Sequence, residues 1–126
     1  MQGYINTGTN KTPTIKFDPH VGILEIGGRS IPEDPIEFYR PLIDTLTTYA
    51  ISLPPKFLVT IQLEYFNTSS SRCIYSIFKK LETMRKVGSA VEVNWIFEEG
   101  DDEMLEVGED FGAILDIPFN MLPLGR

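Results

Sequence analysis

The segment that most constrains the fold of this 126-residue chain covers residues 57–66, FLVTIQLEYF. Apolar side chains occupy every second position of it: Phe57, Val59, Ile61, Leu63 and Tyr65. This period of two is typical of a β-strand with a buried face. Leu58 and Phe66 are apolar on the opposite face, which predicts a central strand covered on both sides. A β-sheet is therefore expected at the centre of the fold.

Strand and helix patterns alternate on both sides of this segment. In chain order they are strands at 14–18 and 23–26 ended by Gly27 and Gly28, a helix from Pro35 capped by Asp34, the strand at 57–66, a helix carrying the apolar stripe 73–84 and ended by Gly88, a strand at 91–97, a helix from 101 and a short strand at 117–119. The order β-β-α-β-α-β-α-β predicts an α/β fold, in which helices pack against a mixed central sheet.

The length of the chain suits one domain. Residues 1–12 are rich in Gly, Thr and Asn and poor in apolar side chains, so they are expected to form a flexible N-terminal arm. Residues 13–126 are expected to form the single domain. The chain shows no signal-peptide pattern and no apolar run long enough to span a membrane, which predicts a cytoplasmic protein.

The charge of the chain disfavours nucleic acid as a partner. The formal net charge is −7, whereas affinity for phosphate backbones comes from Lys and Arg. Nine of the 18 acidic residues lie between Glu98 and Asp116, a stretch without a base, which suits docking on other proteins. The part from Glu98 to Asp110 could serve an enzyme that uses a divalent metal, but it lacks the spacing of a calcium loop. The favoured interpretation is a solvated helix start.

Few residues are available for nucleophilic or metal chemistry. The chain has one cysteine, Cys73, and one histidine, His20, so a metal site built from several His and Cys side chains is excluded by count. Cys73 lies on the apolar stripe of a predicted helix and is interpreted as a buried structural residue. His20 falls in the predicted hairpin turn and is interpreted as exposed. No nucleotide-binding loop motif occurs, and we expect no cofactor.

The polar segment that follows the central strand is the strongest candidate site. Thr68, Ser69, Ser70 and Ser71 place four hydroxyls in a row at a predicted helix start. One capping side chain satisfies the free N–H groups there, which is the structural interpretation. The functional interpretation is a phosphorylation site, because a helix N-terminus favours a phosphate group.

Three stretches together resemble the SiaC family of bacterial regulatory phosphoproteins: residues 28–39 (GRSIPEDPIEFY), 63–71 (LEYFNTSSS) and 108–111 (GEDF), with 117–119 (IPF) near the end. The resemblance runs from about residue 12 to residue 119. It implies a fold similar to the anti-sigma-factor antagonist (STAS-like) domains, which carry a phosphorylatable hydroxyl at the start of a helix after a central strand.

The resemblance also implies a function without catalysis. Thr68 matches the modified residue, with Asn67, Ser69, Ser70 and Ser71 as the helix cap and its surroundings. A SiaB-type kinase would phosphorylate Thr68 and a SiaA-type phosphatase would reverse this. The unmodified form would bind an effector such as a diguanylate cyclase, whose product is cyclic di-GMP. The alternative is an anti-sigma-factor antagonist that controls transcription. Arg72, Arg29 and Glu33 are the candidate partner-binding residues.

Overall fold

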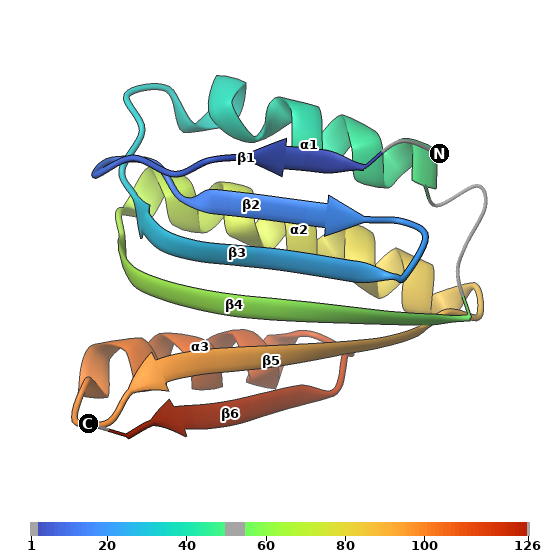
Figure 1. The fold of residues 1–126 in the computed structure, drawn as a ribbon. Helices are drawn as coiled ribbons and strands as arrows, with labels where there is room; N and C mark the ends of the chain where they lie inside the picture. The colour runs from blue at the N-terminus through green and yellow to red at the C-terminus, as the bar shows by residue number, and fades with distance from the viewer. Residues whose placement is uncertain (1–2, 50–54, 126) are drawn as a thin grey trace.

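A single mixed sheet with helices on one face makes up the fold. The computed structural model describes residues 3–49 and 55–125, and over these ranges it has six strands and three helices (Figure 1). The strands lie in chain order across the sheet: β1 (Tyr4–Asn6), β2 (Thr14–Asp18), β3 (Ile23–Ser30), β4 (Lys56–Phe66), β5 (Ala90–Glu98) and β6 (Phe119–Leu124). The first two pairings are antiparallel and the other three are parallel. The predicted α/β class with a mixed sheet is confirmed.

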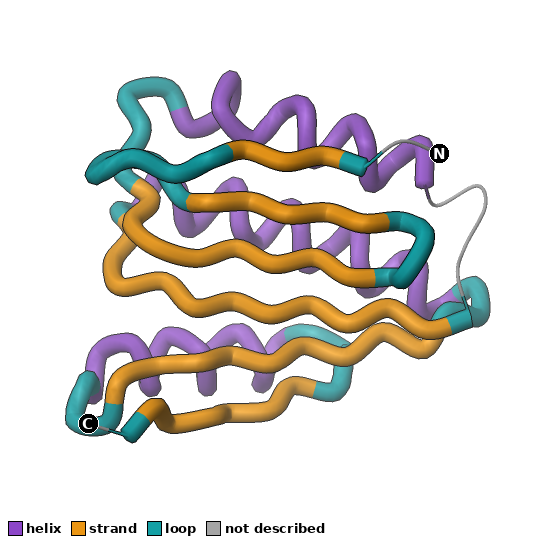
Figure 2. The backbone as a smooth tube through the Cα atoms, viewed as in Figure 1, coloured by secondary structure: helices purple, strands orange, loops and turns teal. Residues whose placement is uncertain are grey.

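The three helices connect the parallel strands. Helix α1 (Pro35–Tyr49) links β3 to β4, α2 (Thr68–Lys86) links β4 to β5, and α3 (Asp102–Ile114) links β5 to β6. Each connection steps to the next strand in the same direction, and such crossovers are right-handed, so all three helices lie on the same face. Figure 2 shows the helices behind the strands along the whole sheet. All three helices begin at the edge where the parallel strands end (Figure 1).

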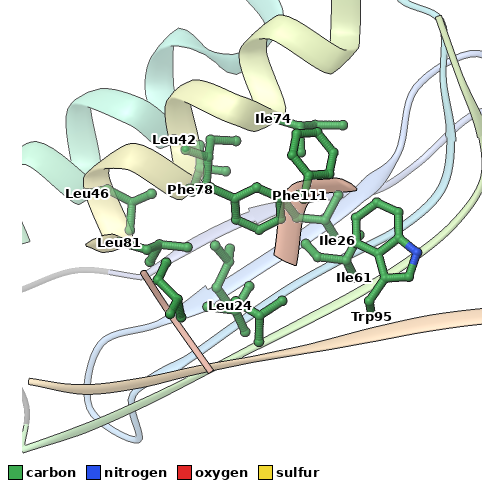
Figure 3. Packing of buried hydrophobic residues seen from close by; sticks show 14 of the residues in the cluster. Leu24, Ile26, Leu42, Leu46, Ile61, Ile74, Phe78, Leu81, Trp95 and Phe111 are labelled. Atoms are coloured by element: carbon green, nitrogen blue, oxygen red, sulfur yellow. The ribbon is translucent and has the colours of Figure 1, made fainter. Parts of the chain in front are cut away.

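The hydrophobic core lies between the helices and this one face. Leu42 and Leu46 of α1 and Phe78 of α2 face the sheet residues Leu24 and Ile61 (Figure 3). The opposite face is open, and Leu58, Gln62 and Glu64 of β4 are exposed on it. The expectation that this strand is covered on both sides is therefore wrong, because no crossover places a helix on the second face among the described residues.

Part of the predicted N-terminal arm belongs to the sheet. Tyr4–Asn6 form β1, which pairs with β2, and Tyr4 packs partly buried against the core. The prediction that residues 1–12 form a flexible arm is therefore wrong for residues 4–6. Residues 1–2 lie outside the described residues. A three-residue edge strand is held by main-chain hydrogen bonds, so its sequence carries too few residues for a recognisable period.

Two strand boundaries differ from the prediction. Strand β3 continues through Gly27 and Gly28 to Ser30, with a register shift after Gly28, whose φ is +102°. The glycines that were expected to end the strand therefore lie within it. The register shift is a bulge in the partner strand β4, where Glu64 is the extra residue between the pairs Gly28–Leu63 and Arg29–Tyr65. Glycine readily adopts the positive φ found at position 28. The last strand covers Phe119–Leu124 instead of residues 117–119. Its outer part contains Pro123, which edge strands tolerate.

Candidate functional site

The candidate site lies where the central strand β4 passes into helix α2. Strand β4 ends at Phe66, and Asn67 forms the N-cap in an extended conformation. The Oδ1 atom of Asn67 accepts a hydrogen bond of 2.9 Å from the N–H of Ser70. Asn67 was expected in this cap region, and it is the capping side chain. The expectation that the serines also serve as the cap is wrong, because they lie within the first turn of α2.

The four consecutive hydroxyl residues differ sharply in exposure. Thr68, the first residue of α2, and Ser69 are exposed, and Ser71 is half-buried. Ser70 is fully buried, and its Oγ atom has no hydrogen-bond partner within the described part of the chain. Thr68 and Ser69 are therefore the two hydroxyls of this run that an enzyme from outside can reach most easily.

Buried polar contacts join the site to the neighbouring elements. The carbonyl of Ser30, at the end of β3, accepts a hydrogen bond of 3.3 Å from the N–H of Asn67. The Ser30 hydroxyl lies 2.5 Å from the hydroxyl of Tyr39 in α1. Burial is the main cause that raises the pKa of Tyr39 to about 12, so its hydroxyl stays protonated at neutral pH. Ser30 thus connects β3, α1 and the cap of α2.

A groove lies between the N-terminal halves of α1 and α2, and its lining includes Ser69, the residue after Thr68. Its volume is about 370 Å³, and its lining comprises Asp34, Pro35, Ile36, Ile43, Ser69, Arg72, Cys73 and Ser76. Asp34 caps α1 as predicted, accepting a hydrogen bond of 3.2 Å from the N–H of Glu37. Ile36 is 67% exposed, so it presents an apolar side chain to solvent at the groove. No pattern in the sequence pointed to this groove.

Cys73 is buried beneath the groove, as the sequence predicts. Burial, with a smaller effect of Asp34, raises the pKa of its thiol. The thiol is therefore protonated at neutral pH and has little nucleophilic character. His20 is exposed in the hairpin turn, far along the chain from these residues. Its backbone N–H donates a hydrogen bond of 3.0 Å to Asp18 Oδ1.

The candidate partner-binding residues share the edge of the sheet at which the site lies. Arg72 is exposed on α2 one turn after Thr68 and lines the groove. Arg29 is exposed at the end of β3, opposite Tyr65 in the register, and Glu33 is exposed in the loop before α1. Among residues 3–49 and 55–125, none of Arg72, Arg29 and Glu33 forms a salt bridge. The groove brings Arg72 together with Ser69 but includes neither of the other two.

The acidic stretch serves the start of α3. Asp101 caps this helix through Oδ1, which accepts a hydrogen bond of 3.1 Å from the N–H of Met104. Asp102 and Glu103 lie in its first turn, in agreement with the interpretation of this stretch as a helix start. Over residues 3–49 and 55–125, no three His, Cys, Asp or Glu side chains are arranged to hold a metal ion. Within the same ranges, no helix has the length and apolar character that crossing a membrane requires.

Comparison with known proteins gives a consistent result. The model of the SiaC family of regulatory phosphoproteins matches residues 6–124. An uncharacterized protein of Pseudomonas aeruginosa strain UCBPP-PA14 is 29% identical over 112 residues, which is 89% of each chain. The structure of SiaC of Pseudomonas aeruginosa is similar with a TM-score of 0.91 and 27% identity, covering 98% of this chain and 100% of that one.

A second solved structure contains a partner. It is the crystal structure of the diguanylate cyclase SiaD in complex with its activator SiaC, also from Pseudomonas aeruginosa. The similarity has a TM-score of 0.90 and 26% identity, and it covers 96% of this chain and 99% of that one. This chain is therefore similar in fold and sequence to SiaC, which is the activator of the diguanylate cyclase SiaD in that complex.

Proposed function

The chain belongs to the SiaC family of regulatory phosphoproteins, and we propose that it is a non-catalytic switch whose state is set by phosphorylation of Thr68. A SiaB-type kinase adds the phosphate and a SiaA-type phosphatase removes it. The unmodified chain binds and activates an effector, and the phosphorylated chain releases it. The switch operates in the cytoplasm, where ATP is available to a kinase.

The position of Thr68 is the observation that carries this proposal. Thr68 is exposed at the first residue of a 19-residue helix, and only the cap residue Asn67 separates it from the central strand β4. The positive end of the helix dipole favours a phosphate there, so the modification does not oppose the fold. Ser70 in the same turn is fully buried, which disfavours it as a substrate. Ser69 is exposed as well and is the competing acceptor.

A diguanylate cyclase is the best-supported effector. SiaC of Pseudomonas aeruginosa is the activator of the diguanylate cyclase SiaD in their crystal structure. This chain is similar to that activator along almost its whole length. By this similarity, the unmodified chain activates a cyclase and thereby raises cyclic di-GMP, the signal that controls biofilm formation and aggregation.

Electrostatics explain how one phosphate can end the interaction. The phosphate adds roughly 1.5 to 2 negative charges at neutral pH, one residue before Ser69, which lines the groove between α1 and α2. A partner whose surface is complementary to the unmodified groove would bury that charge without a counter-ion, which is costly, and any carboxylate that it places nearby would be repelled. A change of about 1.4 kcal/mol already weakens binding tenfold.

Mass spectrometry tests the modification. The full chain is purified from its host with and without the candidate kinase gene, and tandem spectra locate any phosphate. Phosphate on Thr68 that depends on the kinase is the expected result. Phosphate on Ser69 instead, or no phosphate under any growth condition, contradicts the assignment.

The effector is tested separately. The unmodified chain is added to a purified diguanylate cyclase from the same organism, and cyclic di-GMP production is measured. We expect activation by the unmodified chain and little by the phosphorylated chain. Binding to an anti-sigma factor without any effect on the cyclase would favour the alternative of transcriptional control.

A further inference from the structure

We propose that Arg72 is the counter-ion of phosphorylated Thr68, and that phosphorylation withdraws its guanidinium from the groove between α1 and α2. The inference rests on the proposed modification of Thr68. It assigns Arg72 a different role in each state of the chain. In the unmodified chain its side chain is available to a partner, and in the phosphorylated chain it pairs with the phosphate within α2.

The spacing along α2 places the two side chains on the same face. Thr68 and Arg72 are four residues apart, so they are neighbours on the helix surface. The Cα–Cβ bonds of a helix tilt toward its N-terminus, so the side chain of Arg72 leans back over the turn that contains Thr68. An acidic group four residues before a basic one is also the more favourable order of the two.

The ion pairs of α2 leave Arg72 available. Lys79 and Lys86 pair with Glu82, at 2.6 Å and 4.0 Å, and Arg85 pairs with Asp116 at 3.4 Å. Arg72 is exposed and has no salt bridge within the described part of the chain. No existing salt bridge therefore has to be broken when Arg72 turns toward a phosphate.

The chemistry of the two groups suits a close pair. A phosphate presents three acceptor oxygens, and a guanidinium donates two parallel N–H groups to such an acceptor. The carboxylate of Asp34, the capping residue just before α1, lines the groove and acts in the opposite direction by repelling the phosphate. Pairing with Arg72 therefore offsets that repulsion and holds the phosphate against α2.

The pairing would change what a partner meets at the groove. In the unmodified chain, Arg72 lines the groove beside Ser69 and above the buried Cys73. Once its guanidinium binds the phosphate, a partner loses this cation and faces a group of net negative charge. One modification thus removes an attraction and adds a repulsion.

The test uses the full chain with phosphothreonine incorporated at position 68 during translation, so that it does not depend on any kinase. The variants are Arg72→Gln, Arg72→Lys and Lys80→Gln. The last is the control, because Lys80 lies on the same helix without a salt bridge to any described residue, about 18 Å along the axis from Thr68. Phosphorus NMR then measures the second pKa of the phosphate in each chain.

We expect the pKa of the phosphate to rise by about half a unit or more in Arg72→Gln, because the nearby cation that stabilises the dianion is lost. Lys80→Gln should match the wild type, and Arg72→Lys should lie between the two because the charge is kept but the paired donors are not. The contribution of Asp34 is present in every variant and cancels from the comparison.

Two outcomes would overturn the pairing: equal pKa values in the wild type and Arg72→Gln, or an equal rise in Lys80→Gln. Circular dichroism of the unphosphorylated variants checks that the substitutions at exposed Arg72 and half-buried Lys80 leave the fold intact. A failure to find phosphate on Thr68 in the host is a different result. It would contradict the proposed function, whereas the NMR comparison tests the pairing alone.

Discussion

The hydroxyl oxygens of Ser30 and Tyr39 lie 2.5 Å apart in the protein interior, where neither residue is exposed to solvent. Ser30 ends strand β3 and Tyr39 lies in α1. The carbonyl of the same Ser30 accepts a hydrogen bond from the N–H of Asn67, the cap of α2. Ser30 therefore links this buried polar contact to the cap residue that precedes Thr68.

Removing both partners of this contact should cost less stability than the two single removals added together. Tyr39→Phe or Ser30→Ala leaves a buried hydroxyl without a partner, which costs about 1 to 3 kcal/mol. The double variant Ser30→Ala with Tyr39→Phe should lose less than the sum of the two single losses. Urea denaturation of all four proteins measures the coupling, and strictly additive losses would show that the two hydroxyls do not depend on each other.

A close approach between α3 and β5 requires the glycine at position 108. A Cβ atom there would lie 2.5 Å from Cδ1 of Trp95 and 2.6 Å from Cε of Met121. The indole N–H of Trp95 donates to the carbonyl of Met104 over 3.0 Å, which fixes the ring beside α3. Gly108→Ala should therefore reduce the free energy of unfolding by about 1 to 3 kcal/mol, because the core has to shift.

Gly112 in the same helix provides the matched control. A Cβ atom at Gly112 would make an ordinary contact of 3.4 Å with Phe119. Gly112→Ala should leave stability unchanged or raise it by up to about 1 kcal/mol, since Ala favours a helix more than Gly does. Thermal unfolding followed by Trp95 fluorescence compares the two variants. Equal effects of the two substitutions would contradict the role of close packing at Gly108.

The parts of the fold predicted from sequence are those with one-sided burial. The core faces of β4 and α2 show periods of two and of about four because each buries a single face. Strand β1 has three residues and no such period. The open second face of the sheet depends on the direction of the crossovers, which leaves no mark in the pattern of any one strand. Apolar Leu58 on that face led to the wrong expectation.

The candidate site was predictable in part for a similar reason. The run of hydroxyls after a buried strand marks Thr68 locally, and Asn67 belongs to the residue types most favoured at an N-cap. The groove was not predictable, because its two walls come from separate segments of the chain, residues 34–43 and 69–76. Ile36 and Arg72 share its lining only after α1 and α2 have packed side by side.

The cap of α2 provides a test of what holds Thr68 in place. Asn67→Ala removes the acceptor of the Ser70 N–H and should cost about 1 kcal/mol of stability. Asn67→Asp keeps an acceptor and should retain most of the stability, so it is the control. Chemical denaturation measures both. If Asn67→Ala is as stable as the wild type, the Asn67 cap does not contribute to the stability of α2.

Glu82 should make stability depend on acid pH. Its carboxylate is buried and accepts hydrogen bonds from the N–H of Asp116, at 2.8 Å, and from Lys79, at 2.6 Å. These contacts, the Asp116 N–H first, lower the pKa of Glu82 below its usual value of 4.5. A carboxyl with a lowered pKa stabilises the fold above the unfolded pKa, and this contribution is lost as the pH falls through the folded pKa.

The comparison of Glu82→Gln with the wild type isolates this contribution. The difference in stability between them should be present at pH 7 and should shrink as the pH falls below about 4.5. Glu37→Gln is the control, because Glu37 pairs with Arg40 on the surface at 3.4 Å, and such pairs contribute about 1 kcal/mol or less. Urea midpoints from pH 3 to 7, roughly the range of carboxyl titration, provide the measurement. A difference that is constant across this range would contradict the assigned role of Glu82.

Substitution of Thr68 separates its role in the switch from its role in the fold. Thr68→Ala should keep the stability nearly unchanged, because Thr68 is exposed and Asn67 supplies the cap. The variant should take up no phosphate from the kinase and should bind the effector permanently. Ser69→Ala, which removes the neighbouring exposed hydroxyl, should still be phosphorylated on Thr68 and should then release the effector. Kinase assays with intact-mass detection followed by binding measurements compare the two.

The acidic variant Thr68→Glu should imitate the phosphorylated chain only in part. A carboxylate carries one negative charge and two acceptor oxygens, whereas a phosphate carries roughly 1.5 to 2 charges and three acceptors. Weaker repulsion of the partner and weaker pairing with Arg72 are both expected, so effector affinity should fall between those of the unmodified and the phosphorylated chains. Affinity of Thr68→Glu equal to the wild type, together with phosphate uptake by Thr68→Ala, would move the switch to another residue.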